Sequence, residues 1–311
     1  MVSLLTNNSA MTALSTLTLT NRRLEITQGR ISTGMRVAEA QDNAAYWSIA
    51  TTMRSDHSSL STVQDALGLG SGVVDTAYST LGSALKVAQQ LKDKLVAARQ
   101  PGIDRTKVQA EISELQKNLQ GMAEAASFSG ENWLSVDSGV TGYNATKTVV
   151  SSFTRTGGTV SIGTISVDTT TTKLFDLDAT ASGILDGSRD ATGAVSASGT
   201  FTISTLDIST LTNSTADLTT LEAYIQGADS AIKDITAAAA NLGAVKARID
   251  IQKDFVSNLM GAIERGISQL VDADMNEEST RLQAFQVQAQ LGVQALSIAN
   301  QASQNILSLF Q

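Results

Sequence analysis

One continuous apolar stripe decides the fold, and it runs through residues 49–95, IATTMRSDHSSLSTVQDALGLGSGVVDTAYSTLGSALKVAQQLKDKL. Its positions recur at alternating spacings of four and three residues, which is the heptad pattern of a coiled-coil helix. Asp56 and Gly70 occupy the two stripe positions that lack an apolar side chain. A polar residue in such a position can fix the register of the helices, and a glycine lets a neighbouring backbone come close. The apolar members are Ile49, Met53, Leu60, Val63, Leu67, Val74, Ala77, Leu81, Ala84, Ala88, Leu91 and Leu95.

Two further helices carry the same pattern. Arg99-Gln100-Pro101-Gly102 ends the first helix, and Asp104 is a candidate N-cap for a second helix that ends near Ser129-Gly130. A third heptad helix covers residues 218–270, with lysines in two stripe positions, Lys246 and Lys253. At 1.5 Å per residue this helix is a rod of ~80 Å, so it is long enough to pair with the first helix along most of its extent.

The segment between the second and third helices has a different composition. From about Ser138 to Thr215 it is rich in Ser, Thr, Gly and Asp. Alternating apolar residues predict a β-hairpin of residues 149–153 and 160–167, with Gly163 as a bulge, and Phe201 with Ile203 predicts another strand. Because the heptad stripe is absent here, we expect a locally closed, β-rich insert or a partly disordered segment.

These patterns predict a mainly α protein: a long antiparallel coiled-coil rod with paired terminal helices and a small β-rich, Ser/Thr/Gly-rich outer insert. The formal net charge of -8 argues against nucleic acid and anionic membranes as partners, since both reward clustered Lys and Arg. No run approaches the ~18 consecutive apolar residues of a membrane span. Residues 1–7 lack the basic and apolar regions of a secretory signal, so we expect no cleaved leader.

The residue inventory predicts no enzyme and no cofactor or metal site. Cysteine is absent and His57 is the sole histidine, which excludes thiolate catalysis, Cys-ligated metals and multi-His sites. The acidic segment 272–278 resembles a calcium loop, but Glu277 stands in place of the required glycine and Gln283 in place of the bidentate acid. We therefore expect a solvated bend at this segment.

The two chain ends are unusual because residues 1–21 and 282–311 contain no charged side chain. Both are patterned as helices, and the C-terminal one carries two apolar stripes that point in different directions. Apolar residues on more than one face indicate a helix buried by several partners, although the pattern alone also fits an ordinary pair of terminal helices in a bundle. The candidate polymerisation interface consists of Leu14, Leu17, Leu24, Ile31, Leu282, Phe285, Val287, Leu291, Leu296, Ile298, Ile306 and Leu309.

Recognisable motifs lie at both ends. The N-terminal ones are Arg30-Ile31-Ser32-Thr33-Gly34-Met35-Arg36-Val37, Ala40, Asp42-Asn43-Ala44-Ala45 and Ile49-Ala50. The C-terminal ones are Arg281-Leu282, Val287-Gln288, Gln290-Leu291, Ala295-Leu296-Ser297-Ile298-Ala299-Asn300-Gln301 and Ile306-Leu307-Ser308-Leu309. In this order they resemble the ends of bacterial flagellins, over about residues 1–135 and 215–311.

The resemblance implies a structural subunit that polymerises with itself, or with sister flagellins, into the flagellar filament used for swimming motility. It implies that residues 1–44 and 271–311 form the inner filament core, that 45–140 and 215–270 form the rod domain, and that 141–214 is a variable, surface-exposed domain. It further implies type III export, an extracellular location, and an export chaperone, a filament cap and junction proteins as partners.

The resemblance also points to receptor recognition. Plant receptors read the segment equivalent to residues 29–50, so the candidate residues are Arg30, Ser32, Gly34, Arg36, Asp42 and Asn43. Asp42-Asn43 departs from the more frequent acidic pair, which weakens this expectation. Animal receptors contact a segment near residues 89–97 that usually carries Arg, and since none occurs between Arg54 and Arg99 we expect a poor agonist.

Two other classes remain as alternatives. A hook–filament junction protein shares the two-ended architecture, but we expect it to match the run from Ala295 to Leu309 less closely. A secreted coiled-coil translocator needs a long apolar hairpin for membrane insertion, which this sequence lacks.

Overall fold

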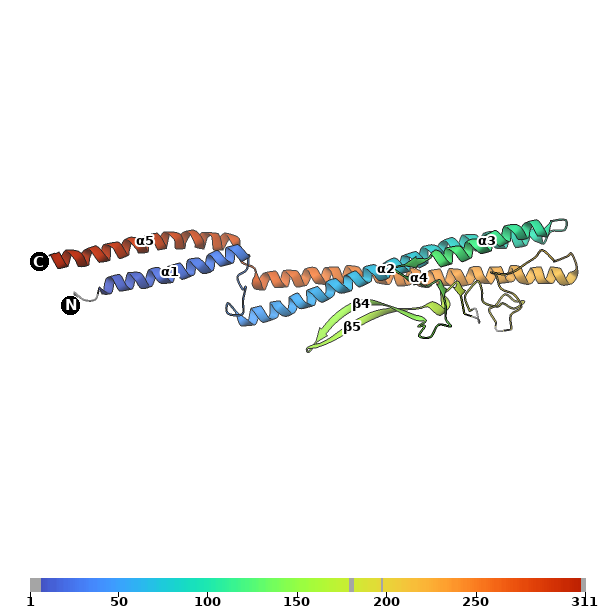
Figure 1. The fold of residues 1–311 in the computed structure, drawn as a ribbon, viewed down its shortest axis with the longest axis horizontal. Helices are drawn as coiled ribbons and strands as arrows, with labels where there is room; N and C mark the ends of the chain where they lie inside the picture. The colour runs from blue at the N-terminus through green and yellow to red at the C-terminus, as the bar shows by residue number, and fades with distance from the viewer. Residues whose placement is uncertain (1–6, 179–181, 197, 309–311) are drawn as a thin grey trace. The chain divides into compact units, whose positions relative to one another are not determined.

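A computed structural model describes residues 7–178, 182–196 and 198–308 (Figure 1). The predicted mainly α fold is confirmed. The helices are α1 (Asn8–Thr33), α2 (Ala44–Ala98), α3 (Arg105–Ala125), α4 (Thr215–Val271) and α5 (Met275–Ser308). The strands are β1 (Ser127–Phe128), β2 (Glu131–Asn132), β3 (Ser135–Val136), β4 (Thr146–Thr156), β5 (Thr159–Asp168) and β6 (Phe175–Asp176). The chain divides into two compact units, residues 1–58 with 260–311, and residues 59–259.

In the first unit, α1 and α5 lie side by side and run antiparallel (Figure 1). Asn7 caps α1 by accepting from the amide of Ala10, and Gly34 ends it in the left-handed conformation at φ 72°. The less exposed side chains of both helices recur at alternating spacings of three and four, so the pair forms a heptad seam. Its members are Ala10, Ala13, Leu17, Thr20, Leu24, Thr27 and Ile31 on α1, and Glu278, Leu282, Phe285, Ala289, Gly292, Leu296 and Ala299 on α5.

The bend between α4 and α5 is held by the segment that follows α1. The amide of Arg36 donates to the carbonyl of Val271 at 2.6 Å, and the amide of Ala273 donates to the carbonyl of Gly34 at 2.9 Å. The bend is solvated as expected, since Asp272 and residues 274–277 are exposed, but Glu278 is buried and accepts from Arg30 Nη1 at 3.3 Å and Arg281 Nη1 at 3.0 Å. A buried carboxylate needs such partners, because an unpaired one would be costly.

In the second unit, α2 and α4 pair as the antiparallel coiled coil that the heptad stripes predict, and three ion pairs define their register. Asp75 pairs with Lys246, Lys92 with Asp229 at 2.6 Å, and Arg99 with Glu222 at 3.8 Å. Each advance along α2 is matched by an equal step back along α4, as an unbroken antiparallel coiled coil requires. The stripe is buried from Leu60 to Leu95, including Gly70, whereas Ile49 at the start of the helix is 50% exposed, so its predicted burial was wrong.

The predicted turn and cap between α2 and α3 are confirmed. Gly102 takes φ 88°, and the Asp104 side chain accepts from the amides of Thr106 and Lys107. The buried guanidinium of Arg105 then donates to the carbonyls of Ala98 and Leu211 and to the side chain of Asn213. One arginine therefore ties the end of α2, the start of α3 and the segment before α4 together.

The predicted β-hairpin is present as antiparallel β4–β5, with Gly157 and Gly158 at positive φ in its two-residue turn. The bulge lies elsewhere than expected. Val150 pairs with Thr164 and Ser152 with Gly163, so the extra residue is Ser151 on β4, and Gly163 lies opposite the bulge.

The rest of the insert is less regular than predicted and is not locally closed. Phe201 and Ile203 are buried, but Phe201 makes only an isolated β-bridge with Arg189 and no strand forms there among the described residues. The fully buried Arg189 donates to Asp234 on α4 at 2.9 Å, and Gln116 on α3 donates to the carbonyl of Ile203 at 2.9 Å. The insert thus depends on the helices for its own polar partners.

A buried ion pair braces the parallel pair β3–β6. Lys173 Nζ lies 2.5 Å from Asp176 Oδ2, which also accepts from the hydroxyls of Ser138 and Ser182. Burial alone would raise the pKa of Asp176, but these hydrogen bonds, with that from the Ser138 amide, outweigh it and lower the pKa below the ordinary value. A lowered pKa in the folded state means that this carboxylate stabilises the fold above pH ~4 and that the contribution is lost as the pH falls.

Gly70 on α2 makes room for Val149 at the base of the insert, which gives a test of the packing. A Cβ at Gly70 would overlap Val149 Cγ1, whereas one at Gly68 meets nothing within 4 Å. We expect Gly70→Ala to lower the free energy of unfolding by about 1–3 kcal/mol, because overpacking strains a buried contact. Gly68→Ala is the matched control and should raise the stability by up to about 1 kcal/mol through helix propensity. Urea denaturation followed by circular dichroism decides, and equal effects of both substitutions would contradict this packing.

Candidate assembly interface

The α1–α5 pair presents apolar side chains on its outer surface as well as in its seam. Leu291 is 57% exposed and Ile298 is 67% exposed. Such a concentration of large exposed apolar residues on a helix pair marks an interaction surface. The exposed members are Met11, Leu14, Leu19 and Ile26 on α1, and Met275, Val287, Leu291, Val293 and Ile298 on α5.

The candidate interface residues fall into two sets. Those that lie in the seam between α1 and α5 are Leu17, Leu24, Ile31, Leu282, Phe285 and Leu296. Those that point outward are Leu14, Val287, Leu291 and Ile298. Ile306 belongs to α5, and Leu309 lies outside the described residues.

The structure corrects one stripe and adds residues to the surface. The sequence pattern placed Leu14 with Leu17 on one stripe, but the seam uses the smaller Ala13 instead, and Leu14 is exposed. Leu19, Ile26 and Val293 were not predicted as interface residues. Leu19 and Ile26 are seven residues apart and share a face of α1, but it is not the face of Leu17 and Leu24, so a search for one periodic face passes over it.

The polar side chains of α1 are suited to burial. The hydroxyls of Thr12, Thr16, Thr18, Thr20 and Thr33 each donate to the backbone carbonyl four residues earlier. A hydroxyl whose donor is already satisfied loses little when water is removed from it. Residues 1–21 and 282–311 also carry no charge, so the part of the surface that they form can pack against other chains without burying an unpaired charge.

The segment proposed for plant-receptor recognition is occupied by contacts within the chain. Besides Arg30 and Gly34 described above, the Arg36 guanidinium donates to the carbonyl of Leu270 at 3.2 Å. The Asp42 side chain accepts from two backbone amides, and Asn43 accepts from the amide of Tyr46 as a cap of α2. Ser32 is exposed.

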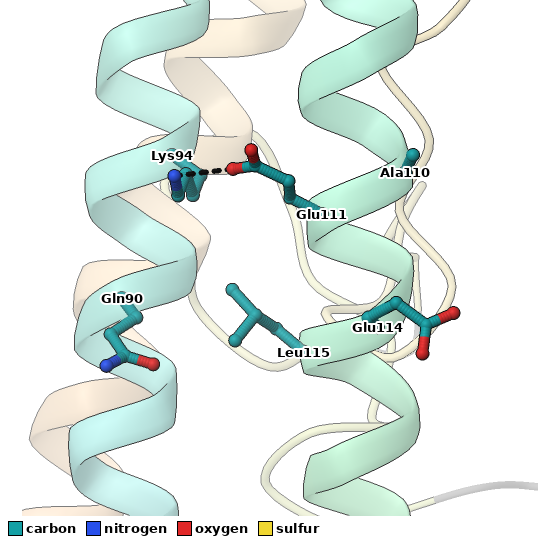
Figure 2. A pocket seen from close by; sticks show the side chains of 6 residues that line it. All are labelled: Gln90, Lys94, Ala110, Glu111, Glu114 and Leu115. Carbon is teal, nitrogen blue, oxygen red and sulfur yellow. Dashed lines mark ion pairs between the residues drawn. The ribbon is translucent and has the colours of Figure 1, made fainter.

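A groove of about 680 Å³ lies between α2 and α3, next to the segment 89–97. Figure 2 shows Leu115 pointing from α3 towards α2, near the ion pair of Lys94 with Glu111, whose atoms are 2.5 Å apart. This segment has no Arg, and both of its lysines, Lys92 and Lys94, are in ion pairs within the chain.

Neither a metal centre nor a membrane span emerges from the part of the chain that the structure describes. Within those residues, no cluster of three His, Cys, Asp or Glu side chains could hold a metal ion. None of the helices there is both long and apolar enough to cross a bilayer.

Long helices with uncharged chain ends, residues 1–21 and 282–311, agree with what comparison with known proteins shows. Residues 4–138 match the bacterial flagellin N-terminal helical region, and residues 225–310 match the bacterial flagellin C-terminal helical region. Flagellin C of Rhizobium meliloti (strain 1021) is 47% identical over 322 residues, and Flagellin A of Rhizobium meliloti is 42% identical over 397 residues. The flagellin of Brucella melitensis biotype 1 is 44% identical over 312 residues. Each alignment covers 100% of both proteins.

The chain therefore belongs to the bacterial flagellin family. It is a structural subunit of the bacterial flagellar filament, the polymer used for swimming, and the hook–filament junction alternative has no better support.

The outward face of α5 gives a direct test of its role. We expect Leu291→Gln to leave the melting of the monomer unchanged, because this side chain is exposed there. Its burial in a filament is worth about 1.5–3 kcal/mol, so the critical concentration for assembly should rise about 10- to 100-fold.

Leu177→Gln is the matched control, since Leu177 is a comparably exposed leucine of the insert, at 67%. Sedimentation of filaments over a range of protein concentrations measures the effect. An unchanged critical concentration for Leu291→Gln, or the same rise for both variants, would remove this face from the interface.

Proposed function

We propose that α1 and α5 are the element through which this flagellin polymerises, with the seam residues holding the pair together and the outward residues meeting other copies. The observation that carries the proposal is the second apolar face of α5, represented by Val287, Leu291 and Ile298, which its own chain leaves exposed. A face without charged groups and with satisfied hydroxyls can be buried at low desolvation cost.

The same reasoning supports a division of labour along the chain. In this proposal residues 1–44 and 271–311 form the inner core of the filament, residues 45–140 and 215–270 form the rod around it, and residues 141–214 face outward. The charge-free ends support an inner position, because a core packed by many copies favours uncharged helices. The many charged groups along α2 and α4 suit a partly solvated rod.

The remaining roles follow from family membership. The protein acts by assembly and carries out no catalysis; it leaves the cell by type III export and reaches the extracellular filament. On the way it meets an export chaperone, and in the filament it meets cap and junction proteins. Family membership supports these roles, and co-purification from cells that express the export apparatus tests each of them.

Removal of residues 282–311 tests the proposed polymerisation element. We expect the truncated chain to retain the circular dichroism and melting of the rod, since residues 59–259 form a compact unit of their own. It should fail to form filaments, because most of α5 and its outward face are gone.

The control is the full chain, which should grow long filaments from seeds in electron micrographs, as a junction protein would not. Sedimentable filaments from the soluble truncated protein would show that the terminal helices are not the polymerisation element.

A further inference from the structure

The β4–β5 hairpin changes its apolar face halfway along its length. Near its base, Ile165 and Val167 of β5 are buried together with Val149 of β4, which lies against Gly70 of α2. Side chains alternate along a strand, so Val160 and Ile162 must lie on the opposite face of β5, away from this packing. Ile162 is 61% exposed.

The bulge at Ser151 makes the apolar side chains of β4 change face at the same point as those of β5. An extra residue shifts the alternation by one, so Phe153 lies on the opposite face from Val149. Phe153 pairs with Ile162, and Arg155 pairs with Val160 while its guanidinium carbon lies 5.8 Å from the centre of the Phe153 ring. The bulge therefore creates an outward apolar face with a cationic rim, and we call these four residues the hairpin tip face.

An exposed apolar patch on α4 has the matching character. Ile251 is 71% exposed and Phe255, one turn further along, is also exposed. Residues four apart lie on the same side of a helix, and Asp254 projects from the same turn. This patch thus consists of two large apolar side chains next to a carboxylate. The hairpin tip face consists of apolar side chains next to a guanidinium.

We propose that the hairpin tip face of one subunit docks on the Ile251–Phe255 patch of α4 in a neighbouring copy. Val160 and Ile162 on one surface and Ile251 and Phe255 on the other remain exposed in the isolated chain, and Phe153 is half-buried. The chain also belongs to a family of filament subunits. A contact between two different surfaces of identical chains does not close on itself, so it suits an open helical polymer. The inference rests on self-assembly through the terminal helices and adds a second contact, made by the rod and the insert.

The absence of cysteine from the chain permits a clean cross-linking test. Chains carrying Ile162→Cys are copolymerised with chains carrying Phe255→Cys and mildly oxidised. Since a disulfide requires Cβ atoms about 3.5–4.5 Å apart, we expect a reducible heterodimer in filaments and none in mixed monomers.

The control replaces Ile162→Cys by Ser161→Cys, because Ser161 is an exposed neighbour on the other face of β5. It should give no heterodimer with Phe255→Cys. Filaments without the Ile162–Phe255 cross-link, or with equal cross-linking from Ser161, would overturn the docking while leaving polymerisation itself intact. Failure of the unmodified chain to polymerise would instead refute the function on which the inference rests.

A double-mutant cycle provides a measurement that does not depend on cysteine chemistry. If Ile162→Ser and Phe255→Ser each raise the critical concentration about 10-fold, the double variant should also raise it about 10-fold, because both remove the same contact. A rise of about 100-fold, or no rise for either single variant, would overturn the proposal. The melting of each monomeric variant confirms that it folds.

Discussion

Two helices packed side by side can bury only the faces that meet, and this constraint governs the first unit. Both α1 and α5 place a heptad seam between them, yet each carries large apolar residues on its other side. At about 25 cal/mol per Å² of apolar surface, covering several hundred Å² of such a face yields several kcal/mol before ordering costs. The isolated chain cannot gain this energy, whereas a polymer can, because each subunit acquires several neighbours.

The second unit shows the opposite condition, since its apolar stripe is covered within the chain. The core residues of α2 meet α4, Val149 of the insert fits against Gly70 of α2, and Phe128 of β1 fits against Gly72. Exposed ion pairs such as that of Arg99 with Glu222 are worth only about 0.2–1 kcal/mol each, but the pairs between α2 and α4 all agree with one antiparallel register. We therefore expect the rod to fold before assembly. We expect the terminal helices to gain most of their stability from assembly.

Much of this could be read from the sequence, because heptad spacing, caps and turn residues are local signals. The first helix end at Pro101-Gly102, the cap at Asp104 and the two-glycine hairpin turn follow from such signals. The choice between Ala13 and Leu14 for the seam does not, because it depends on how the partner helix is aligned. The larger apolar side chain is the natural candidate for burial, yet here the alanine faces α5 and the leucine faces outward.

The insert escaped prediction for a related reason. A single extra residue at Ser151 reverses every side chain beyond it, and sequence alternation alone does not reveal which strand takes the extra residue. The burial of Arg189 and Phe201 depends on contacts with α4, which lies far along the chain. Irregular loops have no sequence periodicity from which such contacts could be predicted. The burial of Glu278 likewise depends on Arg30, from the other end of the sequence.

The central claim is that α1 and α5 gain most of their stability from neighbouring subunits, and amide hydrogen exchange followed by mass spectrometry tests it most directly. Exchange is measured on the monomer and on the filament at the same pH and temperature. The account predicts fast exchange along residues 8–33 and 275–301 in the monomer and strong protection of both in the filament, while residues 60–95 are protected in both states. Equal protection of the terminal helices in monomer and filament would contradict it.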